Sequence, residues 1–212
     1  MFKRITTTLI SFLLLTASAH AGGKIGASLA YGNADSSGTI TEGSTETAKS
    51  GDDNAPLVQF FAEAQVEDSP FSIGIAFMPL SEIADADGTV TDATIKITKH
   101  FTLYGKLEGE FPLGGTIFAK AGISRGDLKV DSLTTTSGDG LIDNVDTLTG
   151  HTVGLGYERD ISGDTFVRAE VNYSTYDDVT GTSNNLAGND TAKTFKADLD
   201  LTMFMISFGK KF

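Results

Sequence analysis

The sequence predicts an all-β protein, built as an antiparallel up-and-down barrel of eight strands. Three observations support this fold class. Apolar residues alternate with polar or small ones in eight segments, which is the period of two that strands have. Long polar stretches and short turns alternate between the segments. The last segment, 204–212, carries large apolar residues at four of five positions on one face and ends on Phe212.

The first 21 residues are predicted to be a cleaved secretory signal. Lys3 and Arg4 form its positive start, residues 9–15 its short apolar core, and Ala19-His20-Ala21 its cleavage site. Residues 22–212 are predicted to form one domain, the barrel. No later apolar run approaches the roughly 20 residues that a membrane-spanning helix needs.

Composition excludes several classes of function. The formal charge is −12, and removing Lys3 and Arg4 makes it −14. Such an acidic chain is unsuited to nucleic acid, whose phosphates require clustered lysine and arginine. Cysteine is absent, which excludes disulfides, thiol chemistry and a lipidated cysteine.

The predicted strands each have an apolar and a polar face. In the first, Ile25, Leu29 and Tyr31 share the apolar face. In the longest, 93–111, the odd positions are apolar except for Lys99 and two glycines. All four prolines lie at strand ends, where a missing ladder donor does no harm. The eight predicted strands are residues 24–31, 57–67, 71–78, 93–111, 116–124, 149–158, 165–173 and 194–212.

The last strand changes phase along its length. Ala197, Leu199 and Leu201 alternate in odd positions, whereas Phe204 and the apolar residues after it occupy even ones. A β-bulge near Thr202 or Met203 would reconcile the two phases by inserting one residue. We therefore expect residues 194–201 in an outer rim and 204–212 facing lipid.

The stretches between the strands are predicted to be four long polar loops on one side of the barrel, at residues 33–54, 81–92, 126–146 and 176–193. They hold 17 of the 28 acidic residues and lack periodicity, so little fixed structure is expected in the first. Because strand 93–111 exceeds the 9 to 11 residues of a membrane strand, its excess is expected to project on the side of the loops.

Residue size indicates which face looks outward. A soluble barrel would place the apolar face inside, and a membrane barrel would place it toward lipid. An eight-stranded barrel has a narrow interior, and here the polar face carries the small residues while the apolar face carries the bulk. Aromatic residues also lie near both ends of the apolar face, as in the two interfacial girdles of membrane barrels. The small residues are Gly26, Ser28, Ser72, Gly74, Gly122, Ser124, Gly154 and Gly156, and the aromatic ones are Phe71, Phe111, Tyr157, Phe212, Tyr31, Phe77, Phe101 and Tyr173.

Four segments carry a resemblance to a known family: Phe101-Thr102-Leu103-Tyr104-Gly105-Lys106, Gly154-Leu155-Gly156-Tyr157-Glu158, 167–173, and the C-terminal strand. The chain resembles the small eight-stranded outer-membrane barrels of OmpA and OmpX type over residues 22–212. This resemblance implies the outer membrane of a Gram-negative envelope, short periplasmic turns, both termini in the periplasm, and four extracellular loops.

The resemblance also implies partners. These are outer-membrane lipid and lipopolysaccharide, the barrel-assembly machinery and periplasmic chaperones. The C-terminal insertion signal would consist of Phe204, Ile206, Phe208 and Phe212. Lys210 departs from the family pattern, although its stem can lie along lipid with the ammonium in water.

Charges of both signs occupy the polar, inward face. Isolated charges in a narrow lumen would be costly, so we expect them to pair. The hypothesis is an ion-pair plug centred on Arg168, with Glu63, Glu108 or Glu170 as its partner, which would close the barrel. The alternative is a gated channel for ions or small solutes. The predicted network consists of Glu63, Lys106, Glu108, Lys120, Arg168 and Glu170.

Other chemistry has weaker support in the sequence. A few outer-membrane barrels modify lipids with a histidine, but no motif surrounds His151 or His100. Residues 85–88 and 139–143 resemble fragments of calcium loops, yet neither completes the twelve-residue pattern. We expect no enzymatic activity, cofactor or bound metal, and a surface role in which the acidic loops contact an extracellular ligand.

Overall fold

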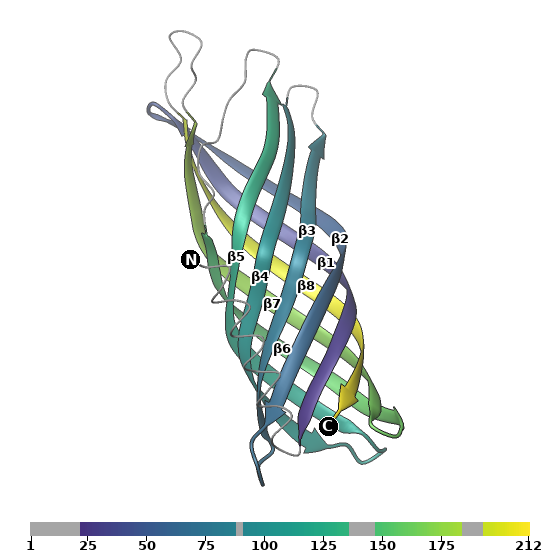
Figure 1. The fold of residues 1–212 in the computed structure, drawn as a ribbon. Coiled ribbons are helices and arrows are strands. Elements are labelled where there is room, and N and C mark those ends of the chain that lie inside the picture. Colours follow the sequence, from purple (N-terminus) through teal and green to yellow (C-terminus); the bar gives the residue numbers. More distant parts are fainter. Residues whose placement is uncertain (1–21, 88–90, 136–146, 184–192) are drawn as a thin grey trace, which may run out of the picture.

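The computed structural model describes residues 22–87, 91–135, 147–183 and 193–212. These form a closed barrel of eight antiparallel strands, each paired with its sequence neighbour, with β8 returning to β1 (Figure 1). The predicted fold class is therefore confirmed. The strands are β1 (Gly23–Glu42), β2 (Thr45–Gln65), β3 (Phe71–Asp87), β4 (Thr91–Glu110), β5 (Thr116–Thr135), β6 (Thr147–Ser162), β7 (Thr165–Ser183) and β8 (Lys193–Lys211).

One end of the barrel carries the short turns. They connect β2 to β3, β4 to β5 and β6 to β7, and the last has only Gly163 and Asp164 between its strands. The first and last strands meet there, since the Gly22 amide donates to the Phe212 carbonyl at 3.0 Å and the Phe212 amide donates to the Gly23 carbonyl at 2.9 Å. Within the described residues, no helix is long and apolar enough to cross a membrane. The predicted signal, residues 1–21, lies outside them.

The strands reach much further than predicted at the other end. Residues 33–54, predicted to be a loop, form the upper parts of β1 and β2, joined by a two-residue turn at Gly43 and Ser44. Gly43 has a φ of 61°, as a tight type II′ turn requires. Much of the other three predicted loops is likewise strand. Residues 93–111 are also not the longest strand, because β2 has 21 residues and β4 has 20.

The predicted faces are confirmed along the lower part of each strand. Glu63, Ser72 and Phe166 point into the barrel and are at most 1% exposed. Leu29 and Phe204 point outward and are 69% and 61% exposed. An apolar outer surface that encircles the molecule exceeds the patches of soluble monomers and is typical of a wall that faces lipid.

A β-bulge in β4 shifts the alternation of faces in the part of the strand above it, as Ile97 shows. Pairing with β5 shifts between Thr98 and Phe101, and Lys99 in this interval has a φ of 54°. The extra residue changes the alternation above it, so Ile97, predicted to face outward, is completely buried inside.

The bulge predicted in β8 near Thr202 or Met203 is wrong. Pairing of β8 with β1 is regular from Lys193 to Lys211. Leu201, Met203 and Met205 all point inward, with exposures of 1 to 3%. The phase change in the sequence therefore reflects a change in the lining of the lumen, which becomes apolar toward the long-hairpin end. This upper apolar cluster comprises Ala30, Ala34, Ala55, Leu57, Met78, Ile97, Leu148, Tyr176, Leu201, Met203 and Met205.

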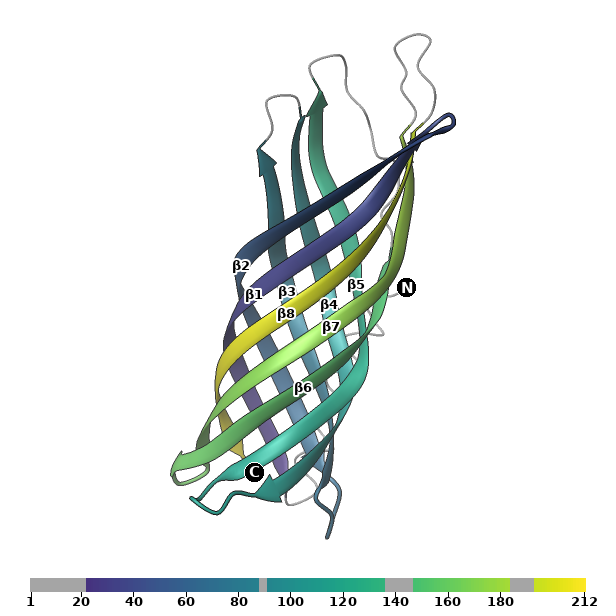
Figure 2. The same cartoon turned by 180° about the vertical axis from the view of Figure 1, so that it is seen from behind.

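The wall is least continuous between β2 and β3. Only six residue pairs join these strands, from Gln65 paired with Ser72 up to Phe60 paired with Phe77, whereas twenty pairs join β1 and β2. Above Phe60 and Phe77, β2 leans away with β1, β7 and β8, while β3 rises with β4 and β5 (Figures 1 and 2). Pro56 lies on β2 and Pro79 on β3 just above the last pair, and neither can donate a ladder hydrogen bond. We call this unpaired stretch the β2–β3 seam.

Candidate functional site: an ion-pair network in the lumen

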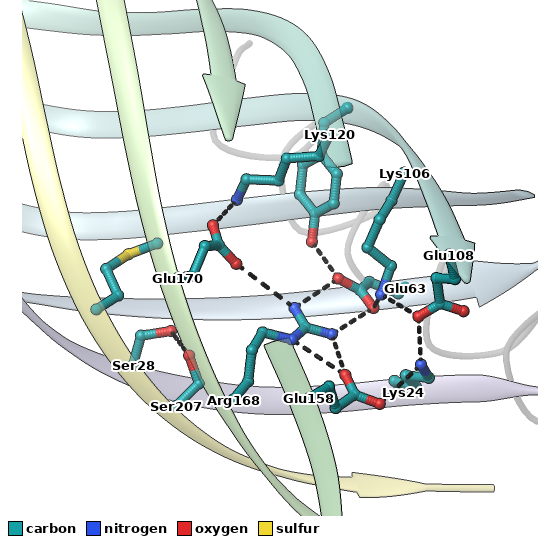
Figure 3. Close-up of polar contacts among 12 residues, drawn as sticks. Lys24, Ser28, Glu63, Lys106, Glu108, Lys120, Glu158, Arg168, Glu170 and Ser207 are labelled. Atoms are coloured by element: carbon teal, nitrogen blue, oxygen red, sulfur yellow. Dashed lines mark hydrogen bonds and ion pairs between the residues drawn. The ribbon is translucent and has the colours of Figure 1, made fainter. Parts of the chain in front are cut away.

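A network of charged side chains fills the half of the lumen nearest the short turns (Figure 3). The alternation that sends apolar residues outward sends these charges inward. All six residues of the predicted network lie in it, together with Lys24 and Glu158. They come from β1, β2, β4, β5, β6 and β7.

Arg168 is the centre of the network. Its two terminal nitrogens donate to the two carboxylate oxygens of Glu63, both at 2.8 Å. Its Nη2 and Nε also donate to Glu158, at 2.7 and 3.1 Å. Its Nη1 lies 3.9 Å from Glu170. A planar guanidinium suits this arrangement, because its donors form a rigid fork that matches a carboxylate.

A second arm runs along the bottom of the lumen. Lys106 pairs with Glu63 and lies 2.9 Å from Glu108. Lys24 contacts Glu108 at 2.6 Å and Glu158 at 2.9 Å, which closes a loop of alternating charges back to Arg168. Glu108 was predicted as a possible partner of Arg168, but its ion pairs are with Lys24 and Lys106.

Lys120 and Glu170 form the upper arm of the network. Close by, the Tyr104 hydroxyl donates to Glu63 at 2.8 Å. Tyr104 can approach because its cross-strand neighbour is Gly74, where an added Cβ would lie 2.4 Å from the Tyr104 ring. The glycine therefore makes room for an aromatic ring inside the narrow barrel.

Aromatic faces cover the remaining surface of the cations. The Arg168 guanidinium lies 4.6 Å from the ring centre of Phe61 and 4.9 Å from that of Phe118. Lys106 lies 5.2 Å from Phe118. Such contacts stabilise a desolvated cation by up to about 2 kcal/mol.

The network is balanced in charge. Among its buried members, four cations, Lys24, Lys106, Lys120 and Arg168, face four carboxylates, those of Glu63, Glu108, Glu158 and Glu170. At the rim, Lys211 lies 3.4 Å from Glu158 and is itself paired with Asp160. Desolvating unpaired charges would cost several kcal/mol each. Here each charge has a partner of opposite sign, and Arg168, Lys106, Glu63 and Glu158 are at most 1% exposed.

Lys24 and Glu158 were missing from the predicted network, although both lie on faces predicted to point inward. Their places on the inward face were the signal that could have identified them. Lys24 is the second residue of β1, and Glu158 lies near the end of β6. Because all strands tilt in a barrel, residues near their ends at the short-turn side still meet at one level.

Hydroxyl groups line the wall above the charges. Thr102, Ser124, Thr152 and Ser174 form a chain across β4 to β7, with oxygen–oxygen distances of 2.6 to 2.7 Å. His100 and Tyr176 then hydrogen-bond across the lumen at 2.7 Å. Tyr176 also belongs to the upper apolar cluster, which continues toward the long hairpins, so the lumen is layered from charged to hydroxylated to apolar.

The remaining predicted features lie on the surface or outside the described residues. His151 is exposed on the outer wall of β6. The predicted calcium-loop fragments reach outside the described residues, at residue 88 and at residues 139–143. In the part of the chain that the structure describes, no group of three or more candidate ligands could hold a metal ion. Phe204, Ile206, Phe208 and Phe212 point outward with exposures of 49 to 61%.

Comparison with solved structures shows similar barrels. The outer membrane protein OprG from Pseudomonas aeruginosa aligns with a TM-score of 0.61 at 17% identity, covering 91% of this chain and 96% of OprG. AlkL, determined in lipid bilayers, aligns with a TM-score of 0.50 at 10% identity, covering 91% and 92%. Ail of Yersinia pestis gives 0.49 at 11% identity, covering 91% and 100%. At these identities the likeness shows the fold alone.

Sequence comparison gives the family. Among curated proteins, none is similar enough in sequence to count as a match. The family model for the outer membrane protein beta-barrel domain, however, matches residues 7–212. This match spans every strand of the closed barrel, and its family implies the bacterial outer membrane. The chain therefore belongs to the outer membrane protein beta-barrel domain family.

Proposed function

We propose that the protein is a non-enzymatic surface barrel of the Gram-negative outer membrane, with an axis closed to water and ions. The long hairpins would face outward and both termini would lie in the periplasm. One observation carries the proposal: the Arg168 network spans the bore with side chains that are almost completely buried. Contact with lipopolysaccharide and, through the acidic hairpins, with an extracellular ligand belongs to the same proposal.

Steady conduction requires a continuous hydrated path with charges that bind ions weakly. Here the carboxylates are already bound to Arg168 and the three lysines. The layers above offer hydroxyls bonded to one another and then apolar side chains. An ion entering the bore would have to break several buried pairs, each of which is costly to break.

Liposome swelling tests the closed axis. Purified barrels in liposomes should admit small sugars and amino acids no faster than liposomes without protein. Replacing Arg168 and Glu63 together by serine removes the centre of the plug and one charge of each sign, so that the remaining network stays balanced, and should increase the rate. Rapid swelling with the wild-type protein would refute the proposal.

The non-enzymatic part has its own test. Refolded protein incubated with phospholipid and lipopolysaccharide should leave the acyl chains intact. Lipid deacylation that disappears in His151→Ala, with the barrel still folded, would instead assign a catalytic role to that histidine.

A second candidate function is a sideways passage for apolar solutes. The β2–β3 seam supports it, because Leu57 and Met78 of the upper apolar cluster lie on the two strands that flank it. An apolar molecule could enter the upper lumen and leave through the seam into the outer leaflet without crossing the charged layer. This route is compatible with an axis closed to ions.

Fluorescent fatty-acid analogues added outside proteoliposomes would test the second candidate. Wild-type protein should accelerate their entry into the bilayer. Met78→Gln should slow it, because the amide would be desolvated in the seam, whereas Ile206→Gln on the lipid-facing wall should not. Equal rates with and without protein would eliminate this candidate.

A further inference from the structure

We propose that Lys99 and Arg125 form a binding site for a phosphate group of lipid A, the anchor of lipopolysaccharide. The site lies on the outer wall of β4 and β5, at the upper edge of the apolar band. It rests on the orientation given in the proposed function, because the upper edge meets the outer leaflet only if the long hairpins face outward.

Lys99 lies in the β4 bulge and points to the outside. A lysine with a φ of 54° occupies the left-handed region, which is unfavourable for residues with a long side chain. The side chain is 73% exposed, and its ammonium lies 2.7 Å from the Asp127 carboxylate on β5. Asp127 thus holds the lysine against the barrel wall beside β5.

Arg125 supplies the second cation. It pairs across the strands with Phe101, two residues below Asp127 on the same outer face of β5. Its side chain is exposed, and within the described parts of the chain it has no ion-pair or hydrogen-bond partner. Lys99 and Arg125 are therefore diagonal neighbours, within reach of each other's long side chains. Together with Asp127 they leave one net positive charge.

The height of the pair on the barrel fits a lipid phosphate. Phe101 at the level of Arg125 pairs with Phe77 on β3, and both belong to the upper aromatic girdle. Leu103 and Ile123, one step lower, are 45% and 55% exposed toward lipid. Aromatic girdles mark the boundary between acyl chains and head groups. The two cations consequently lie where the phosphates of the outer leaflet lie.

The opposite wall carries the opposite charge. In the closed ring β4 lies across from β8 and β5 from β1. Asp35 of β1 pairs with Asp52 of β2 and with Asp200 of β8, and Asp198 borders the same surface. That acidic wall repels phosphate, so the charge pattern directs an anionic lipid to β4 and β5. Lipid A carries its phosphates at this depth in the outer leaflet.

Native mass spectrometry of the full-length barrel in detergent, titrated with bisphosphorylated lipid A, tests the site. At the usual contribution of a basic residue near an anionic surface, Lys99→Gln combined with Arg125→Gln should weaken binding roughly thirtyfold. Asp127→Asn should strengthen it, because Lys99 loses its competing carboxylate. The matched control, Lys196→Gln combined with Lys210→Gln, removes two exposed cations elsewhere and should leave binding unchanged.

Two comparison ligands identify the phosphate source. Dephosphorylated lipid A should bind no better to the wild type than to the double variant, and inorganic phosphate alone should not compete. If phosphatidylglycerol bound as tightly as lipid A, the site would accept any anionic lipid and the assignment to lipid A would be overturned. A folded double variant that binds lipid A like the wild type would also overturn it. Neither result bears on conductance, so the lipid A site and the proposal of an axis closed to ions can fail independently.

Discussion

Arg168 contacts two carboxylates and two aromatic rings, which a lysine could not serve at once. Its fork binds Glu63 through two parallel hydrogen bonds, while the other edge reaches Glu158 and the flat faces contact Phe61 and Phe118. The charge of the residue is therefore only part of its role. Shape and rigidity decide how many strands it connects.

Replacing Arg168 by alanine should destabilise the barrel strongly. Glu63 and Glu158 would remain buried without their main partner, and breaking a buried pair in this way costs about 3–5 kcal/mol. Urea unfolding in micelles, followed by circular dichroism because the chain lacks tryptophan, measures the change. Lys196→Ala breaks only an exposed pair with Asp178 and should leave the midpoint where it was. Equal midpoints for both variants would contradict this account.

Two aspartates above the apolar band should have pKa values that are shifted in opposite directions from the usual value. A hydrogen bond with Asp178 raises the pKa of Asp198. Hydrogen bonds with Asp198 and then Lys196 lower the pKa of Asp178. The stabilisation from Asp198 is therefore present at low pH and lost as pH rises through its folded pKa. That from Asp178 is present at neutral pH and lost as pH falls through its folded pKa.

Carbon-13 NMR of the side-chain carboxyls checks this pattern. The Asp198 midpoint should lie above the usual value for aspartate and the Asp178 midpoint below it. In Asp178→Asn the Asp198 midpoint should return toward the usual value. Identical midpoints for the two wild-type residues would rule out the shared hydrogen bond.

At the scale of the strand, β8 shows why one sequence pattern was misread. Leu199 and Leu201 occupy odd positions, whereas the lipid-facing residues of β8 occupy even ones. If every apolar residue had to face lipid, a bulge would be needed to bring both sets to the outside. The regular pairing with β1 shows instead that the inside becomes apolar at this height. An alternation with a period of two identifies a strand, but it does not show which face contacts lipid and which lines the lumen.

Single-cysteine variants test the phase of β8, since the chain has no cysteine of its own. Leu201→Cys should resist a water-soluble maleimide, because position 201 is 1% exposed inside the barrel. Asp200→Cys lines an open groove on the outer surface and should react readily. If Leu201→Cys reacted faster than Asp200→Cys, position 201 would face outward, as the predicted bulge requires.

The β1–β2 hairpin gives a second test at this scale. Its upper half was predicted to be a loop with little fixed structure because it is rich in polar residues and glycine and lacks periodicity. A Gly-Ser pair between two threonine-containing segments was the available signal, since that pair suits a two-residue turn. Hydrogen exchange should therefore show protected amides on both strands up to the turn at Gly43 and Ser44. Fast exchange throughout residues 33–54 would contradict the extended hairpin.

At the scale of the whole molecule, most of the architecture was predictable. Eight amphipathic segments with alternating connections permit few closed arrangements, so strand number, order and lower-wall faces follow from residues such as Phe60, Glu63 and Val171. Ile97 and Leu201 were misplaced because a bulge and a change of lining depend on tertiary packing. The ion pairs were predictable as a set, but which carboxylate meets Arg168 depends on the relative heights of the strands, which the sequence does not state.

The order of the layers in the lumen bears on where the barrel could exchange solutes with its surroundings. The charged layer at the short-turn end is buried and paired, and hydroxyl and then apolar side chains line the lumen above it. The long hairpins and the β2–β3 seam lie beyond the section that we propose to be closed. Exchange with the outside would thus be confined to the upper lumen and the surface.

Planar-bilayer recording of the refolded wild-type protein tests the closed axis most directly. With buffered potassium chloride on both sides, the account predicts no sustained current above that of the bare bilayer over a wide range of voltage. Heat-modifiable migration on gels should show beforehand that the inserted protein is folded. Large, steady single-channel steps from that folded protein would contradict the claim that the Arg168 network closes the barrel.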